Sequence, residues 1–582
     1  MTQDGGAIIG KTLAARGVRQ LFTLCGGHIS PILIGAKASG IDVVDVRDEV
    51  SAVFAADAVA RMTGIPGVAA VTAGPGVTNT VTAVKNAQLA QSPLVIFGGA
   101  AATLLKGRGA LQDIDQISLM ESITKWAVSL KTVNSIGPTV EKAFDLAQDG
   151  VPGPVFIEVP IDLLYAEDLV RDMFMKESGV KDAKNLGSKA LELYMRGHLY
   201  RQFHQPHVSI VPPILESLPP KPSLRGPHVD KVASLLQEAQ RPALIIGSQA
   251  LVNCRDPEPL ADGVRALGIP TWLGGTARGL LGRRSEIQFR HKRGAALKEA
   301  DLVIVAGFPF DFRLGYGRSI SSRATLVAAN LSATEMRKNR RPEIPVHMHA
   351  GEFLRSLADT IGQSLGPWNE WFETLRAREA QRDQEIQSQA KAPSELVNPL
   401  ELFLRLEEKM ADDAVLVVDG GDFVATAAYI LRPRQPLSWL DPGVFGTLGV
   451  GGGFAVGASK VRPGKEVWLI YGDGSCAYSL AEIDTYVRHG LAPIAVIGTD
   501  GSWAQIAREQ VPLLGDDVGT VLRRTDYHDA AQGYGAVGLL LDDPAKIDST
   551  LDRAKELAAS GKPVVINVHI GSSEFRKGSI SM

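Results

Sequence analysis

The stretch EVWLIYGDGS (466–475) is an apolar run of strand character that ends in a glycine-rich turn carrying Asp473. A second stretch, APIAVIGTD (492–500), has the same form and ends on Asp500. Short runs rich in Val, Ile and Leu that alternate with helical patterns are typical of parallel β-sheets covered by helices. Ligands bind such sheets at the carboxyl ends of the strands. The two stretches therefore predict an α/β fold with a ligand site where both aspartates lie.

The same alternation continues outward in both directions and forms three blocks. Its other apolar runs are QLFTLCGG (20–27), DVVDVRD (42–48), GVAAVTAGPG (67–76), SPLVIFGG (92–99), GPVFIEVP (153–160), RPALIIGSQA (241–250), IPTWLGG (269–275), ADLVIVAGF (300–308), TLVAANLS (325–332), AVLVVDGGD (414–422) and PVVINVHIG (563–571). We predict three consecutive parallel-sheet α/β domains. Their expected bounds are 1–168, 227–365 and 396–582, with an interdomain connection at 169–226 and a linker helix at 366–395.

The composition narrows the class of protein. A chain of 582 residues with 45% hydrophobic and 21% charged residues is too long for one hydrophobic core and ordinary for a globular enzyme. A net charge of −3 gives no reason to expect nucleic acid as a partner. The three cysteines lie far apart without CxxC spacing, which argues against a disulfide framework or a zinc site. No signal peptide and no apolar run of about 18 residues is seen, so we expect a cytoplasmic enzyme without a membrane span.

The two aspartates predict a metal site. Carboxylates at the ends of neighbouring strands can share one hard cation, and Mg²⁺ prefers oxygen ligands that include one or two carboxylates and phosphate oxygens. Asp473 and Asp500 would supply the carboxylates, and the backbone carbonyl of Ser502 would complete the protein ligands. The alternative is an ordinary strand-to-helix turn in which Asp473 only caps a helix.

GDGS (472–475), with a second ligand at the end of the next strand, resembles the thiamine-diphosphate motif of the acetolactate synthase and pyruvate decarboxylase superfamily. That motif usually ends in Asn, whereas this chain has Asp500, which adds negative charge beside a diphosphate. The resemblance implies thiamine diphosphate held through Mg²⁺. The cofactor-binding residues that it implies are Gly472, Gly474 and Ser475, together with Gly420, Gly421, Asp422 and Phe423 of a second glycine-rich strand end.

A further segment, RDEVSAVFAADAVAR (47–61), resembles the superfamily's element whose glutamate contacts the aminopyrimidine of the cofactor. Glu49 would stabilise the imino tautomer, which removes the proton from the thiazolium carbon. Leu448 matches the hydrophobic residue that holds the cofactor bent in related enzymes. The alternatives are that Glu49 only faces a helix dipole and that Leu448 only fills a core.

Within the superfamily, this glutamate and the metal site come from different subunits, so the resemblance implies a homodimer or homotetramer. It also implies the roles of the domains. Residues 1–168 would bind the pyrimidine, 396–582 would bind the diphosphate and Mg²⁺, and 227–365 would hold ADP or CoA, FAD, or nothing.

Nearly the whole chain, including LFTLCGGHISP (21–31), VTAGPGVTNTVTAVKNAQLAQSP (71–93) and WLDPGVFGTLGVGGGFA (439–455), resembles the acetolactate-synthase-like branch regarded as 2-hydroxyacyl-CoA lyases. The implied reaction cleaves a 2-hydroxyacyl-CoA to an aldehyde and formyl-CoA and also runs backwards as a condensation. The expected partners are therefore small acyl-CoA and aldehyde substrates.

The resemblance also suggests residues near the substrate. His28 would shuttle a proton, although it could equally be a turn histidine bonded to a carbonyl. Gln112 falls where acetolactate synthases keep an active-site glutamine. Trp503 and Gln505 would line the substrate pocket. Cations suited to CoA phosphates are Arg278 and Arg313, unless they are solvated surface residues.

Two other functions stay open at this point. An acetolactate synthase would join two 2-oxo acids and hold FAD in the central domain, and the segment around Arg313 also resembles its FAD side. A non-catalytic thiamine-diphosphate-binding scaffold would bind the cofactor without needing Glu49.

Overall fold

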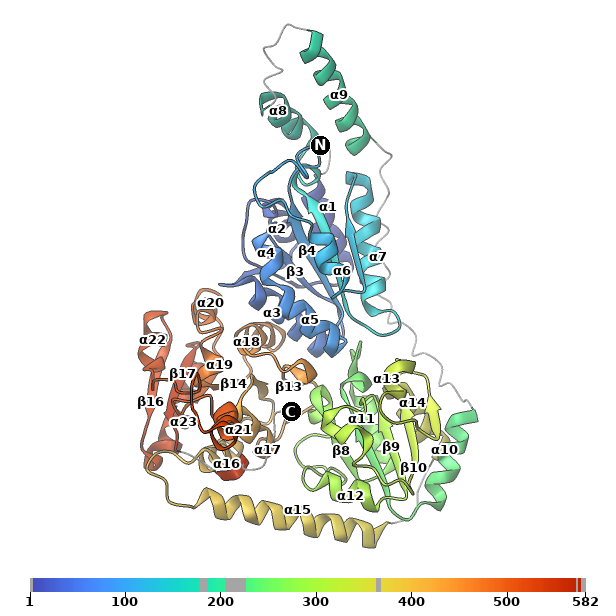
Figure 1. Ribbon diagram of the computed structural model, residues 1–582, viewed down its shortest axis with the longest axis vertical. Helices are drawn as coiled ribbons and strands as arrows, with labels where there is room; N and C mark the ends of the chain where they lie inside the picture. Colours follow the sequence, from blue (N-terminus) through green and yellow to red (C-terminus); the bar gives the residue numbers. More distant parts are fainter. Residues whose placement is uncertain (1–3, 178–185, 205–226, 363–367, 572–573, 577–582) are drawn as a thin grey trace. The chain divides into compact units, whose positions relative to one another are not determined.

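A computed structural model describes residues 4–177, 186–204, 227–362, 368–571 and 574–576. The chain forms two compact units, one built around the first sheet and one around the second and third sheets (Figure 1). Each unit is described by itself below.

The first unit contains a six-stranded parallel sheet with the strand order β2-β1-β3-β4-β6-β5. Its strands are β1 (Gln20–Thr23), β2 (Asp42–Asp45), β3 (Gly67–Val71), β4 (Leu94–Ala100), β5 (Trp126–Ser129) and β6 (Pro154–Pro160). Its helices are α1 (Gly5–Ala15), α2 (Ser30–Ala38), α3 (Glu49–Thr63), α4 (Pro75–Asn79), α5 (Val81–Ala90), α6 (Gln116–Glu121), α7 (Ile136–Gln148), α8 (Glu167–Glu177) and α9 (Leu186–Phe203). Every residue of β3, β4 and β6 is buried, as expected for parallel strands covered on both faces.

The second unit begins with a five-stranded parallel sheet of order β11-β10-β9-β7-β8. Its strands are β7 (Pro242–Ile246), β8 (Thr271–Leu273), β9 (Leu302–Ala306), β10 (Thr325–Ala329) and β11 (Ile344–Val346). The helices of this part are α10 (Pro227–Glu238), α11 (Glu258–Leu267), α12 (Arg293–Glu299), α13 (Ala333–Arg337) and α14 (Ala350–Ile361). The long helix α15 (Asn369–Ala390) then leads to the third sheet, and its Trp371 and Leu375 are buried.

The third sheet is also parallel, with six strands in the order β13-β12-β14-β15-β17-β16. Its strands are β12 (Val415–Val418), β13 (Trp439–Leu440), β14 (Val467–Gly472), β15 (Ile494–Thr499), β16 (Val537–Leu541) and β17 (Val564–His569). Its helices are α16 (Pro399–Lys409), α17 (Asp422–Ile430), α18 (Val450–Val461), α19 (Asp473–Cys476), α20 (Glu482–Arg488), α21 (Ala504–Leu514), α22 (Tyr527–Gly533) and α23 (Ile547–Ala559). The first and third sheets share one strand order when each is numbered from its own first strand. The predicted fold class of three parallel α/β sheets is confirmed.

Strands β5, β11, β13 and β16 lie outside the apolar runs named above, and each is at the edge of its sheet. An edge strand pairs with a single neighbour and is often short. The residues of β5 are all half-buried, and β13 is only two residues long.

Helices α8 and α9 fall at the end of the predicted first domain and within the predicted connection. Figure 1 shows them side by side, beyond the sheet of the first unit. A small apolar cluster, formed by Ala102, Val170, Phe174, Met195 and Leu199, joins them to the segment after β4. Among the described residues, no helix is both long and apolar enough to cross a membrane. The cytoplasmic location stays a prediction.

Candidate functional site

The second unit has a cavity of about 470 Å³ at the carboxyl ends of β12 and β13, which we call the strand-end pocket. Six of the predicted site residues line it, namely Arg278, Gly420, Gly421, Leu448, Trp503 and Gln505. These residues come from segments that are far apart in the chain, so the fold itself assembles the pocket.

The first wall of this pocket is the turn between β12 and α17. Buried Asp419 ends the strand and accepts hydrogen bonds from the backbone N–H groups of Gly449 (2.9 Å) and Gly451 (2.6 Å). These bonds fasten the start of α18 to the end of β12. Leu448 lies directly over Gly420, because a Cβ added there would be 2.4 Å from Leu448 Cδ2. Burial raises the pKa of Asp419 to about 7.

The turn after β14, where α19 begins at Asp473, does not line the pocket but adjoins two residues that do, since Gly472 lies near Gly420 and Gly474 lies under Trp503. Neighbouring strands β14 and β15 pair Gly472 with Gly498, which brings the two turns together. Asp473 accepts one hydrogen bond from the backbone N–H of Gly474 and one from that of Gly501, both at 2.8 Å. Asp500 accepts from the backbone N–H of Ser502 at 3.0 Å.

Both aspartates are held in an environment that disfavours negative charge. Burial raises the pKa of Asp473. Burial and then the charge of Asp473 raise the pKa of Asp500 to about 7. Two carboxylates that repel each other in a buried turn suit a bound cation, and oxygen donors suit Mg²⁺. Among the described residues, no group of three or more His, Cys, Asp or Glu side chains forms a metal cluster. Further ligands would therefore have to be backbone, phosphate or water oxygens.

Two of the predicted cofactor residues turn their side chains away from the pocket. Asp422 forms ion pairs with Arg508 and Arg576. Phe423 packs in the core against Phe403 with ring centroids 4.6 Å apart. Both start α17, where only their backbone N–H groups remain suited to an anion.

The remaining predicted residues of this turn have structural contacts. The hydroxyl group of Ser475 donates to the carbonyl of Gly472 at 3.1 Å and so closes the turn. The ring of Trp503 covers Gly474, since an added Cβ there would lie 2.5 Å from the ring. Gln505 follows at the start of α21 and lines the strand-end pocket.

In the first unit, Glu49 is the first residue of α3 and is only 7% exposed. Its carboxylate accepts a hydrogen bond from the side-chain amide of Asn79 at 3.1 Å. It also faces α4, where a Cβ added at Gly76 would lie 3.4 Å from Glu49 Oε1. Asn79 was not predicted, although its position in the glycine-rich segment after β3 is a signal that could have pointed to it.

The other two predicted residues of this unit also lie near the glycine-rich segment. His28 Nδ1 is 3.4 Å from Thr72 Oγ1, and burial lowers the pKa of His28. Gln112 adopts a positive φ of 63° and packs its backbone on Gly74. Such a conformation in a residue other than glycine costs free energy and is often found at functional sites.

Gln116 is a second residue that the sequence did not single out. It is buried, accepts from the backbone N–H of Gly74 at 2.9 Å and donates to Glu158 Oε1 at 3.1 Å. Glu158 is fully buried and pairs with Lys106. This network fixes the loop that carries Gln112.

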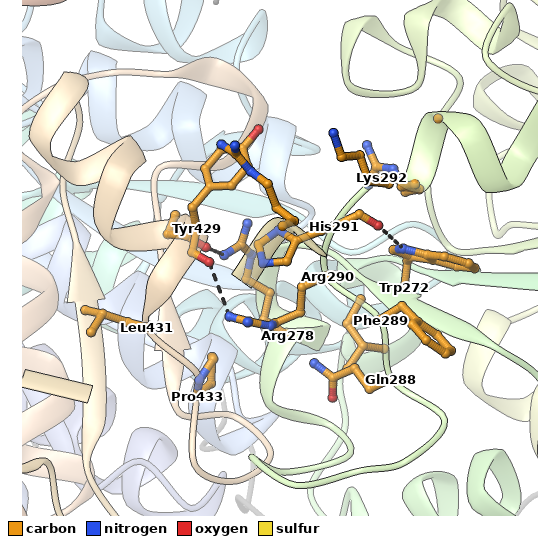
Figure 2. A pocket seen from close by; sticks show the side chains of 15 residues that line it. Trp272, Arg278, Gln288, Phe289, Arg290, His291, Lys292, Tyr429, Leu431 and Pro433 are labelled. Carbon is orange, nitrogen blue, oxygen red and sulfur yellow. Dashed lines mark hydrogen bonds between the residues drawn. The ribbon is translucent and has the colours of Figure 1, made fainter. Parts of the chain in front are cut away.

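A second cavity of the second unit has a volume of about 570 Å³, and we call it the basic pocket. Figure 2 shows Arg278, Arg290, His291 and Lys292 around it, with Tyr429 from the end of α17 on the opposite side. Arg290 forms ion pairs with acidic residues of α15. The basic pocket shares Arg278 and Ala428 with the strand-end pocket.

Three cations of the basic pocket form no close ion pair with a carboxylate of the described residues. Arg278 donates to the carbonyl of Ala428 at 2.9 Å and stacks on Trp439, and burial lowers its pKa. Arg293 donates to the carbonyl of Arg313. Neither of them, nor Lys292, forms an ion pair with a carboxylate in the described part of the chain. Cations that lie together without carboxylates favour an anionic ligand.

The predicted Arg313 differs from Arg278, because it does not line either pocket. Its guanidinium pairs with Asp311, with the closest N···O distance at 2.6 Å, and stacks on Phe308. This ion pair already neutralises the charge that was predicted to face CoA phosphates.

Comparison with protein-family models finds three matches. Residues 3–119 match the thiamine pyrophosphate enzyme N-terminal TPP binding domain, residues 229–357 the central domain of these enzymes, and residues 419–568 their C-terminal TPP binding domain. The chain is 46% identical to 2-hydroxyacyl-CoA lyase 2 of Danio rerio, over 100% of this chain and 94% of the relative. It is 45% identical to the protein of that name from Homo sapiens, over 100% and 92%. A probable acetolactate synthase of Mycobacterium bovis is 32% identical, over 97% and 96%.

Proposed function

Since the chain belongs to the thiamine pyrophosphate enzyme family, in the branch of the 2-hydroxyacyl-CoA lyases, we propose that it cleaves a 2-hydroxyacyl-CoA into an aldehyde and formyl-CoA. The reverse reaction would be a condensation of the same two molecules. The matches confirm the family that the sequence predicted, and the acetolactate synthase is the more distant relative. The observation that carries the substrate proposal is the basic pocket, because it shares a wall with the strand-end pocket.

The strand-end pocket would hold the diphosphate end of the cofactor. Asp473 and Asp500 would bind Mg²⁺ through their carboxylates, with the carbonyl of Ser502 as a third ligand. The backbone N–H groups at the start of α17 would face the phosphate oxygens. Leu448 would support the bend of the cofactor from its place over Gly420. Thiamine diphosphate, when bound, supplies a carbanion and an electron sink for cleaving a carbon–carbon bond.

The first unit would supply the proton-transfer groups. Glu49 would hydrogen-bond the aminopyrimidine, and Asn79 would orient its carboxylate. His28 would accept and return the hydroxyl proton of the substrate, since its lowered pKa keeps the ring neutral at pH 7. Gln112 would contact the substrate from the neighbouring loop. We further propose, from the resemblance alone, the domain bounds given above and an assembly of at least two subunits.

The basic pocket would bind the phosphates of CoA. Lys292 and Arg293 line it and form no close ion pair with a carboxylate of the described residues, and Trp272 and Tyr429 offer aromatic surface to a base. The thioester end of the same ligand would then reach the strand-end pocket past Arg278 and Ala428. Because Arg313 is paired with Asp311, we no longer assign it to the substrate.

The test is to supply Mg²⁺ and thiamine diphosphate and to measure formyl-CoA from a 2-hydroxyacyl-CoA and acetolactate from pyruvate. We expect formyl-CoA. Acetolactate with a flavin spectrum would instead support an acetolactate synthase. Binding of the cofactor without either product, and with the same thiazolium proton exchange in Glu49→Ala, would support a scaffold.

The CoA pocket is tested by the double variant Lys292→Gln and Arg293→Gln. Removing two phosphate contacts should raise the KM for the CoA substrate by about tenfold or more, with little change in kcat. Arg323→Gln, which removes an exposed cation outside both pockets, is the control. If Arg323→Gln raised the KM for the CoA substrate equally, the effect would come from the overall charge and not from binding in the basic pocket.

A further inference from the structure

The first unit contains an apolar cavity of about 240 Å³ between the segment after β4 and helix α8, which we call the tail pocket. Its apolar wall includes Ala102, Leu105 and Leu111 from that segment and Val170, Met173 and Phe174 from α8. Helix α9 supports α8 from behind through the cluster around Met195 and Leu199. The pocket therefore depends on the two helices that follow the first sheet.

The polar residues of the lining are His28, Asp162 and Tyr165. The carboxylate of Asp162 is already used, because it accepts from the backbone N–H of Thr103 (3.0 Å), the hydroxyl of Thr103 (2.6 Å) and the side chain of Gln202 (3.0 Å). The pocket thus presents little unsatisfied polarity to a ligand, and an apolar ligand fits it best.

His28 connects this cavity to the proposed chemistry. It lines the tail pocket, and it is the residue to which we assign the hydroxyl proton of the substrate. A group that extends from the reacting carbon past His28 would enter the cavity. By the proposed reaction, that group is the part of the substrate that leaves as the aldehyde.

We propose that the tail pocket binds the alkyl chain of the aldehyde half of the substrate. This inference rests on the proposed lyase function and adds the class of acyl chain. A cavity of about 150 Å³ holds benzene, so 240 Å³ has room for about ten carbon atoms. The enzyme would therefore prefer chains of medium length.

The experiment measures kcat/KM for a series of straight-chain 2-hydroxyacyl-CoAs with acyl chains of about 4 to 18 carbons. Each methylene that is buried contributes a factor of about four to binding. We expect kcat/KM to rise with chain length and to level off once the chain fills the pocket, near ten carbons beyond the reacting carbon. A flat profile over the whole series would overturn the proposal.

A matched pair of variants on α8 tests whether the preference for chain length arises at the tail pocket. Met173 lines the tail pocket and is 45% exposed, whereas Leu169 does not line it and is 46% exposed. Met173→Trp should shorten the preferred chain and lower the ratio of kcat/KM for long over short chains by at least tenfold. Leu169→Trp should leave that ratio unchanged. Equal profiles for both variants and the wild type would refute the pocket.

Enlarging the cavity gives the opposite change. Phe174→Ala should move the plateau to longer chains, and urea unfolding shows whether the variant is folded. Calorimetric titration with decan-1-ol tests the pocket without turnover, and Met173→Trp should weaken that binding while Leu169→Trp should not. If decan-1-ol binds in this way but no 2-hydroxyacyl-CoA is cleaved, the lyase proposal fails and the apolar site stands. Cleavage without decan-1-ol binding and without the profile change refutes the tail pocket alone.

Discussion

Replacing Gly420 by alanine should disturb the strand-end pocket through a single contact. The new Cβ would lie 2.4 Å from Leu448 Cδ2, closer than the 3.0 Å below which real Cβ contacts are essentially never found. Leu448 therefore has to move, and it would move within the pocket that it lines. Overpacking costs about 1–3 kcal/mol, and we expect the lower end, about 1 kcal/mol, because the contacting atom ends a side chain.

The control is Gly472→Ala at the end of the neighbouring strand β14. There the closest atoms to an added Cβ are Gly420 O at 3.7 Å and Ser475 Oγ at 3.8 Å, which are ordinary contacts. Its φ of −82° also suits alanine. Without cofactor, we expect this variant to unfold within about 0.5 kcal/mol of the wild type.

The assay is urea unfolding without cofactor, followed by titration with thiamine diphosphate and Mg²⁺. Gly420→Ala should lower the free energy of unfolding and weaken cofactor binding about tenfold. In the double variant with Leu448→Ala, the clash disappears, so the two stability losses should not add. Additive losses, or a Gly420→Ala variant as stable as Gly472→Ala, would refute the placement of Leu448 over Gly420.

Three further predictions concern single polar side chains. The folded protein should lose stability as the pH rises from about 4 to 7, because Asp419, with its pKa raised from 3.8 to about 7, keeps a proton that the unfolded chain releases. In urea unfolding, Asp419→Asn should remove this part of the pH dependence. An unchanged dependence of stability on pH in this variant would contradict the prediction. Asp500→Asn should keep Mg²⁺-dependent activity whereas Asp500→Ala should lose it, as measured by Mg²⁺ titration; equal activity of both variants would exclude Asp500 as a ligand. Asn79→Ala removes one hydrogen bond to the Glu49 carboxylate, worth about 1–2 kcal/mol. Proton exchange at the thiazolium carbon, measured by NMR, should slow about tenfold while cofactor affinity changes little. Exchange at the normal rate would refute the role of Asn79 in orienting Glu49.

The central strands and the strand-end aspartates could be predicted because their information is local. A buried parallel strand is apolar throughout, and the turn that follows it carries its glycines and carboxylates within a few residues, as in β14 and Asp473. Edge strands such as β5 and β16 could not be predicted in this way. Their residues, WAVS and VGLLL, are mostly apolar but mostly only half-buried, and burial at the edge of a sheet cannot be read from a run of four or five residues.

The sequence also could not predict which way the side chains point in the turn between β12 and α17. Asp422 and Phe423 follow the predicted glycine pair, yet one joins an ion-pair cluster and the other joins the core. The start of a helix turns successive side chains by about 100°, so only one or two of them can face a given pocket. Which ones do so depends on the orientation of α17 on its sheet.

By itself, the sequence determined the three-sheet α/β class, the thiamine-enzyme family and the carboxylates at the strand ends, since each of these is carried by a short contiguous pattern. Only the tertiary structure decided that Asn79 holds Glu49, that Arg278 borders two pockets, and that α8 closes a cavity against Leu111. These are contacts between residues far apart in the chain. They depend on how helices pack on the sheets, and no local pattern encodes that packing.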